Sequence, residues 1–484
     1  MTEFILAPAL LLAAFLAAVT TIFCLIGLIH VFRRKEGFLP YIFYISTFGN
    51  ILLGITSGRN LSALDDDIGD INLTASPSYV IWIGRLISTL ILFAACQRIV
   101  SRLMHYGSKA NTPTLLIVTL LLFFFTNVFT AAFFSAHPSF EHDYVYLVLT
   151  GAASLLFVQG EEEISIRTLR NALFIFLMIS AGFIPWNPGL VMDNNYLGGV
   201  IPGLTYRYVG LASHSNSLGL ITTLFMLCLW NKPFAGRWIN VLGWTIGYSS
   251  LLLAQSKTSW IGFIMCMSCI GYFKYGDFLK QRLFDFNNPM LPAIFILMTM
   301  ITAGTLSGVV MFSDIGSKID SFFSTRTGAD LMTMTGRTQI WAIALNEWRN
   351  SPIFGYGLTI WDEAHRAKIG MPMAVTAHSQ FYQTLASAGI MGVAGLLIYV
   401  ATLFRFTLKT AKSSEGLTLA IFLMLFFRSI SEVSLAISGH WDADVTIHLL
   451  LLMIIGAQFK SDSVKKSSES LTAHPRLVSS RGFN

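Results

Sequence analysis

Residues 377–406 read AHSQFYQTLASAGIMGVAGLLIYVATLFRF, a short polar sequence followed by a long apolar run. One helical crossing of a bilayer needs roughly 20 apolar residues. The part from 381 to 405 therefore predicts a membrane-spanning helix. His378 stands where the polar segment that precedes this helix gives way to it. The stretch predicts an α-helical membrane protein with a histidine at one end of a span.

Apolar runs of this kind recur along the whole chain. Of its 484 residues, 54% are hydrophobic and only 12% are charged, whereas soluble domains carry about 25% charged residues. The composition predicts an all-α polytopic membrane protein with about 12–13 transmembrane helices. The expected spans cover residues 4–32, 38–56, 79–97, 114–135, 143–159, 169–185, 209–230, 238–254, 258–273, 290–312, 381–405, 416–437 and 443–459.

The distribution of basic residues predicts the orientation of these spans. Most of the 32 Lys and Arg residues fall in alternate connections, and connections rich in Lys and Arg stay in the cytoplasm. The net charge of +6 is spread over these short connections, so it does not indicate nucleic-acid binding. The rule places the amino terminus and the large polar loop 313–380 outside. It also places the tail 460–484 in the cytoplasm, where its Ser, Lys and Glu content predicts disorder.

The large loop contains a predicted amphipathic helix at residues 336–350. Apolar residues recur there at helical spacing, and Pro352 follows the predicted end. Arg337 stands at the amino end, where free backbone N–H groups and the helix dipole favour an anion. We expect Arg337 to bind phosphate, with an ordinary surface charge as the alternative.

Two further polar segments lie at predicted outer ends of spans. Arg207, His214 and Asn216 precede or begin the span 209–230, and Lys257 lies in the polar break before 258–273. Arginine presents a planar fork and lysine a point charge, and both suit a phosphate. The alternatives are interfacial anchoring for Arg207, interhelical hydrogen bonds for His214 and Asn216, and an ordinary short loop for Lys257.

Three more side chains are candidates for supporting roles. Tyr356 lies between two glycines that permit a tight turn. Arg428 and Glu432 are four residues apart in the run 416–437, so they share a helix face. They can form an ion pair within the bundle, or Arg428 can order a cavity at the outer end.

The chain resembles the bacterial superfamily of O-antigen ligases and of O-antigen and exopolysaccharide polymerases. His378 and Ser379, followed after nine residues by Gly389 and then by Gly392, fit the ligase signature H-[NSQ]-x9-G-x-x-[GTY]. The segment 336–357 is similar to the family's loop segment, and the segment around Arg207 is similar to an earlier family segment. The resemblance covers roughly residues 200–440.

The resemblance implies a metal-independent inverting glycosyltransferase without a cofactor. His378 would be the base on the acceptor hydroxyl, and Arg207 and Arg337, joined by Lys257, would bind the donor diphosphate. The expected partners are a polyprenyl-diphosphate-linked oligosaccharide or polysaccharide, an acceptor glycan or lipid A core, and membrane lipids. No metal site is expected, although Asp65 to Asp67 contain a formal D-x-D spacing.

Three functions remain open at this point, and polymerisation of glycan repeat units is the favoured one. A ligase that moves the glycan to lipid A core and, less favoured, a lipid-glycan flippase are the alternatives. The expected organisation is a transmembrane scaffold in 1–200, a catalytic membrane region in 201–459 and the tail 460–484. The expected location is the bacterial inner membrane, with the active site facing the periplasm.

Overall fold

The computed structural model describes most of the chain between residues 37 and 459. The described residues are 37–61, 78–104, 112–194, 204–283, 290, 292–294, 296–298, 300–301, 337–372, 374–437 and 443–459. The predicted span 4–32, most of the span 290–312, the loop residues 313–336, Asp65 to Asp67 and the tail 460–484 lie outside them.

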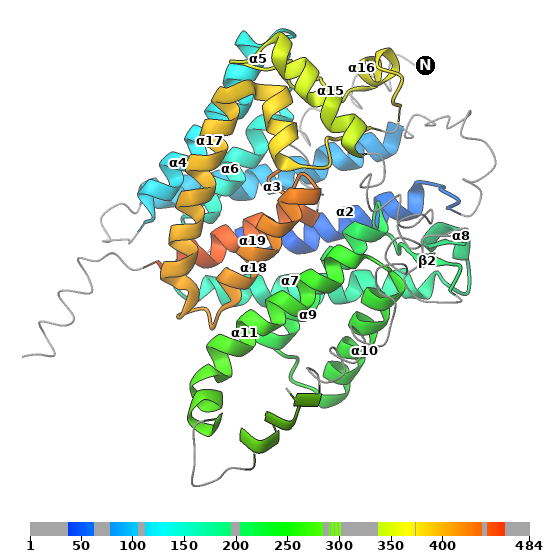
Figure 1. The fold of residues 1–484 in the computed structure, drawn as a ribbon, viewed down its shortest axis with the longest axis vertical. Coiled ribbons are helices and arrows are strands. Elements are labelled where there is room, and N and C mark those ends of the chain that lie inside the picture. The colour runs from blue at the N-terminus through cyan, green and yellow to red at the C-terminus, as the bar shows by residue number, and fades with distance from the viewer. Residues whose placement is uncertain are drawn as a thin grey trace, which may run out of the picture.

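The described chain is a bundle of helices with one two-stranded ladder (Figure 1). The elements are η1 (Leu39–Tyr41), α2 (Ile42–Thr56), α3 (Ser78–Met104), α4 (Thr114–Phe124), the π-helical turn η2 (Phe125–Phe129), α5 (Thr130–Phe134), α6 (Asp143–Ser154), α7 (Glu161–Gly182), α8 (Pro188–Val191), β1 (Met192–Asp193), β2 (Arg207–Tyr208), α9 (Ser215–Asn231), α10 (Arg237–Leu253), α11 (Lys257–Leu283), α15 (Arg337–Asn350), α16 (Glu363–Lys368), α17 (Gln380–Ala411), α18 (Leu417–Ser431) and α19 (Ala443–Gln458).

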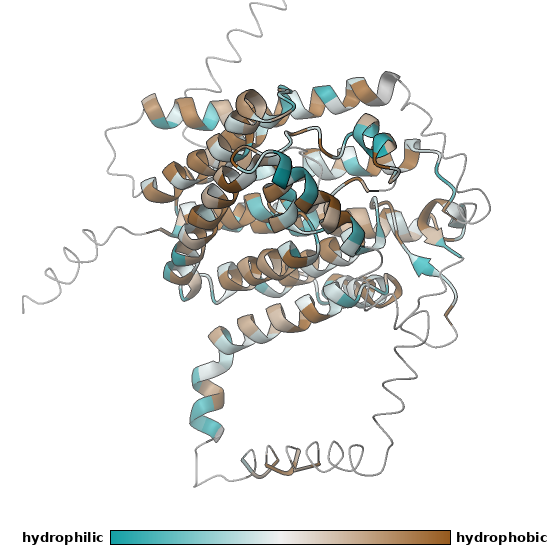
Figure 2. Cartoon of the chain, turned by 45° about the horizontal axis from the view of Figure 1, so that its top comes forward, coloured by the Kyte–Doolittle hydropathy of each residue, from teal (hydrophilic) through white to brown (hydrophobic). Residues whose placement is uncertain are grey.

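The predicted all-α membrane architecture is confirmed. Five helical segments of the described chain are long and apolar enough to cross a membrane, and α18 and α19 are shorter apolar helices. Figure 2 shows that the long helices of the bundle are predominantly hydrophobic. The total number of spans stays a prediction. The five segments are Leu39–Thr56, Ile81–Met104, Thr114–Phe134, Glu161–Gly182 and Gln380–Ala411.

Several helices differ in extent from the predicted spans; α7, α11 and α17, for example, are longer, and α6, α9 and α18 are shorter. Helix α6 ends at Ser154 because residues 155–160 turn into α7, with Gly160 at φ +99°. Helix α9 begins only at Ser215, because Arg207 and Tyr208 pair with β1 as a strand. Helix α18 ends at Ser431, and Glu432 has extended backbone. As a result, His214 and Glu432 lie in connections between helices, although hydropathy assigns both to predicted spans.

Helix α17 is interrupted at Gly389, which has φ +65°. The connection after α15 passes across this break. Its backbone pairs with the helix there, since Tyr356 N–H donates to Ala386 O at 2.8 Å and Ile390 N–H donates to Pro352 O at 3.0 Å. A Cβ on Gly389 would lie 2.4 Å from Ile353 O. Glycine is therefore required at this position for both its backbone angle and its lack of a side chain.

Helix α15 lies at one end of the bundle against α17, and α16 lies at the same end (Figure 1). A small hydrophobic cluster, separate from the main core, holds α15 there. Its fully buried members include Ala344 of α15, Ile360, Ala377 and Ala386 of α17. The predicted amphipathic helix is thus confirmed, and its apolar face packs on α17.

Polar contacts gather at the two ends of the bundle. One set joins Arg337 to Glu432 and Arg428 to Asp444, and we call this the His378 end. The other set includes the pairs Arg98–Glu161, Lys232–Glu163 and Lys274–Glu415 at the opposite end. These basic residues belong to the connections that the sequence predicts to be cytoplasmic.

Candidate functional site

His378 and Glu432 form a close pair at the His378 end. His378 Nδ1 lies 3.0 Å from Glu432 Oε2, and the two side chains are 29% and 17% exposed. Each stands at the end of a helix: His378 comes just before the N-cap Ser379 of α17, and Glu432 is the C-cap residue of α18. The side chains therefore project from two rigid elements into one place.

The charge state of Glu432 determines which nitrogen of His378 carries a hydrogen. Burial alone would raise the pKa of Glu432, but the hydrogen bond with His378 and the positive charges of Arg428 and Arg337 lower it to about 2. An ionised carboxylate can only accept a hydrogen bond. His378 Nδ1 must therefore donate, so Nε2 of the neutral ring keeps its lone pair and can accept a proton.

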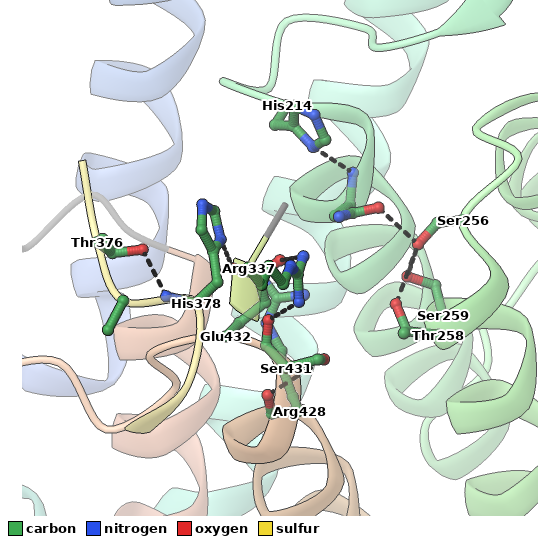
Figure 3. A network of polar contacts seen from close by, with 12 residues as sticks. His214, Ser256, Thr258, Ser259, Arg337, Thr376, His378, Arg428, Ser431 and Glu432 are labelled. Carbon is green, nitrogen blue, oxygen red and sulfur yellow. Dashed lines mark hydrogen bonds and ion pairs between the residues drawn. The ribbon is translucent and has the colours of Figure 1, made fainter. Parts of the chain in front are cut away.

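Arg337 is the second partner of Glu432. Its Nη2 lies 3.1 Å from Glu432 Oε1, and its Nη1 donates to the carbonyl oxygen of Ser431. The side chain is 19% exposed. As expected, Arg337 begins α15. Glu432 thus links the predicted base to one of the predicted phosphate-binding residues (Figure 3).

Arg428 does not pair with Glu432, so that predicted ion pair is wrong. Its Nε and Nη2 bind the two carboxylate oxygens of Asp444 at 2.6 and 3.0 Å. The reason is that α18 ends at Ser431, so Glu432 leaves the helical path before it can share a face with Arg428. Arg428 still acts on Glu432 through its charge, because it lowers the pKa of that carboxyl.

Arg207 and Asn216 belong to a second polar group, which also contains Ser256. Arg207 Nε donates to Ala254 O at 2.9 Å, and its Nη2 donates to Asn216 Oδ1 at 3.1 Å. Ser256 Oγ donates to the same Asn216 oxygen at 3.0 Å. The start of α9 and the connection between α10 and α11 are joined in this way. These contacts fix the direction of the Arg207 guanidinium.

His214 connects the two polar groups. It is the N-cap of α9, and its Nδ1 accepts the backbone N–H of Asn216 at 3.1 Å. The surrounding protein and the charge of Arg207 lower the pKa of His214 to about 4, although part of the ring is exposed. The charges of Glu432 and His378 also act on this ring. Figure 3 shows His214 hydrogen-bonded to the start of α9, in the same view as His378 and Arg337.

Lys257 and Tyr356 take different positions from these groups. Lys257 is the exposed first residue of α11, directly after Ser256. Tyr356 lies between the rings of His137 and His365, with centroid distances of 4.1 and 4.4 Å. The contacts of Tyr356 therefore hold the connection after α15 in place, and they do not join it to the pair of His378 and Glu432.

Sequence reasoning missed two residues that shape the site. Asp444 in the first turn of α19 holds Arg428. Arg59 donates to three carbonyl oxygens, those of Leu190, Gly210 and Ala212, at 3.0, 2.5 and 2.6 Å. It thereby fixes the segment that carries Arg207 and His214. An acidic residue facing an arginine one span earlier was a usable signal for Asp444, whereas nothing in the sequence marked Arg59.

The group has the parts needed for proton abstraction beside an anion. It contains an imidazole oriented by a carboxylate, and guanidinium groups lie on two sides of it. No group of three or more His, Cys, Asp or Glu side chains within the described parts of the chain could hold a metal ion.

Comparison with known proteins finds a matching family model. Residues 242–400 match the family model described as O-antigen ligase. A search of curated proteins finds no matching relative. The matched segment contains Lys257, Arg337, Tyr356 and His378, whereas Arg207, His214, Asn216, Arg428 and Glu432 lie on either side of it. The match supports the resemblance of this polytopic membrane protein to the superfamily of O-antigen ligases and polymerases over residues 242–400.

Proposed function

We propose that the chain transfers a glycan from a polyprenyl-diphosphate donor to a hydroxyl group of an acceptor glycan, and so polymerises O-antigen or exopolysaccharide repeat units. The observation that carries this proposal is the contact between His378 Nδ1 and the ionised Glu432. It leaves Nε2 of the ring as a proton acceptor in a group of arginines. The family match supports glycosyl transfer in general.

The reaction is a single displacement at the anomeric carbon. The acceptor oxygen forms a bond to this carbon while His378 Nε2 takes the hydroxyl proton. The bond between the carbon and the diphosphate oxygen breaks, and the diphosphate leaves with the electron pair. Attack opposite the leaving group inverts the anomeric configuration. Glu432 stabilises the imidazolium that forms, as a carboxylate does in other acid–base pairs.

The leaving diphosphate gains negative charge as this bond breaks, and the arginines stabilise it. Arg337 uses two of its nitrogens on Glu432 and Ser431, and a guanidinium has five N–H donors. It can therefore hold Glu432 and a phosphate oxygen together. Arg207 approaches from the α9 side, and the exposed Lys257 adds a further charge. No metal ion is needed for this role.

The remaining candidates support this machinery. His214 and Asn216 set the start of α9 beside Arg207, and Arg428 keeps Glu432 ionised. The scaffold is 1–200 and the catalytic region is 201–459. The His378 end faces the periplasm of a bacterial inner membrane, since the basic connections gather at the opposite end.

A ligase that transfers the finished glycan to lipid A core is the second candidate. One observation favours it, namely the description of the matching family model as O-antigen ligase. The ligase would use the same base and the same diphosphate-binding residues. The two functions differ in the acceptor that reaches His378.

Analysis of lipid-linked glycans from a strain carrying His378→Ala tests the proposal. The glycans are extracted and separated by size on a gel. Accumulated single repeat units support the polymerase, and accumulated long chains on the lipid support the ligase. Glycans of unchanged length and amount would contradict the assignment of His378 as the base.

A further inference from the structure

Ala377, just before His378, is held through both its backbone N–H and its carbonyl oxygen. Trp341 Nε1 donates to Ala377 O at 2.9 Å, and Ala377 N–H donates to Gln383 Oε1 at 2.9 Å. Ala377 is fully buried. Two side chains from two helices, α15 and α17, therefore determine the path of the chain immediately before the predicted base.

This restraint acts on a strained residue. His378 has φ +46°, a left-handed value that is uncommon for residues with a side chain. Such a conformation costs free energy and persists only where its surroundings enforce it. The His378 amide donates to Thr376 Oγ1 at 3.2 Å, which adds a third contact. If the restraint were lost, the backbone would relax and the imidazole would turn away from Glu432.

Trp341 is well placed to supply the restraint. Its ring stacks on Tyr382 of α17 with centroids 4.8 Å apart and planes at 15°. It lies one helical turn after Arg337, which binds Glu432. A closed set of contacts thus runs from Arg337 through Glu432, His378 and Ala377 to Trp341. Helix α15 holds both the carboxylate and the backbone of the histidine.

We propose that Trp341 is a positioning residue, whose indole N–H keeps His378 in the backbone conformation in which its ring meets Glu432. The inference rests on the proposed function for its catalytic consequence, because it assumes that His378 is the base. It extends that function by assigning a role to a residue outside the site. The backbone part of the inference can be measured without any substrate.

The test compares Trp341→Phe with Trp348→Phe in the full-length protein in lipid nanodiscs. Phenylalanine keeps an aromatic ring that can stack on Tyr382, and it removes the N–H donor together with one ring of the indole. Trp348 is the matched control, because it lies on the same helix and its Nε1 also donates to a carbonyl oxygen, that of Pro352 at 3.1 Å. Gln383→Leu is a second variant, which removes the acceptor of the Ala377 backbone N–H.

Two measurements are made on each variant. The first is hydrogen–deuterium exchange of the segment 376–383 by mass spectrometry. The second is kcat and KM for transfer with polyprenyl-diphosphate-linked glycans extracted from a strain that lacks the chain. Trp341→Phe and Gln383→Leu are expected to speed exchange in this segment and to lower kcat about 10- to 100-fold with little change in KM. Trp348→Phe should match the wild type in both.

The outcomes separate this inference from the proposed function. Unchanged exchange and kcat in Trp341→Phe, or equal losses in Trp341→Phe and Trp348→Phe, would overturn the role of Trp341. Full activity in His378→Ala would instead overturn the proposed base, while faster exchange in Trp341→Phe would still support the backbone restraint.

Discussion

His378, at the start of α17, can be singled out from the sequence alone, whereas its partner cannot. The sequence predicts His378 because a titratable residue stands at the edge of a span. It does not predict the partner, since Glu432 comes from another helix and reaches His378 only because α18 ends at Ser431. Helix periodicity instead pairs Glu432 with Arg428. The end of a helix inside an apolar run was the missing information.

Replacement of Glu432 by Gln tests the orientation of His378. The amide is nearly the same size, but it no longer stabilises a positive imidazolium and can present either a donor or an acceptor to Nδ1. We expect kcat to fall about 10²- to 10⁴-fold, the range that acid–base catalysis supplies. Steady-state transfer assays measure this, with Glu363→Gln, a change at an exposed residue of α16, as the control. Wild-type kcat in Glu432→Gln would contradict the pairing.

The same carboxyl should make stability depend on pH in a defined window. Its pKa is lowered from 4.5 to about 2, since the hydrogen bond with His378 and the nearby arginines outweigh the effect of burial. A lowered pKa contributes stability that is full above about pH 4.5 and is lost as the pH falls towards 2. The difference in unfolding temperature between wild type and Glu432→Gln should stay constant from pH 7 to 5. It should shrink as the pH falls below 4. A difference that grows on acidification would reverse the assigned sign.

At the scale of elements, the interruption of α17 is the feature that hydropathy could not predict. The run 381–405 is apolar throughout, so it predicts one continuous span. Glycines within such a span usually mark close packing between helices. Here Gly389 carries a backbone break instead, and the connection around Ile353 pairs with the freed groups. The family signature marks Gly389 without giving its reason. The long-range pairing supplies that reason.

Gly389→Ala should therefore lower stability and activity much more than alanine at a glycine that has a helical backbone and open space around it. A φ of +65° with a ψ of −158° is a conformation essentially confined to glycine, and it costs about 1–3 kcal/mol for a residue with a Cβ. The added carbon would also lie 2.4 Å from Ile353 O. We expect a lower unfolding temperature and a loss of transfer activity. Gly262→Ala in α11 is the control, because a Cβ there meets nothing within 4 Å. Equal unfolding temperatures for the two variants would show that the break is dispensable.

For the whole molecule, composition was sufficient to predict the fold class, because the need to satisfy backbone hydrogen bonds in a bilayer leaves helices as the common solution. The contacts of Arg207 with Ala254 and Asn216 depend on helix packing, which single-sequence patterns do not contain. The resemblance compensated for part of this, since it named Arg207, Arg337 and His378 together. It could not supply Asp444 or Arg59, whose roles arise from contacts between distant segments.

The two ends of the bundle should lie on opposite sides of the membrane. Thr258 and Lys412 are both exposed. Thr258 lies in the first turn of α11, and Lys412 follows the last residue of α17. With the five native cysteines replaced by alanine, a membrane-impermeant maleimide should label Thr258→Cys in intact cells. It should label Lys412→Cys only after lysis. The reverse pattern would place the His378 end in the cytoplasm.

The central claim is that His378 accepts the proton of the attacking hydroxyl. Its most direct test is single-turnover release of polyprenyl diphosphate from a lipid-linked glycan by the purified protein, with and without an acceptor glycan, for wild type and His378→Gln. If His378 is the base, wild-type release requires the acceptor, and His378→Gln lowers this acceptor-dependent rate about 10²- to 10⁴-fold while donor binding persists. Acceptor-dependent release at the wild-type rate by His378→Gln would contradict it.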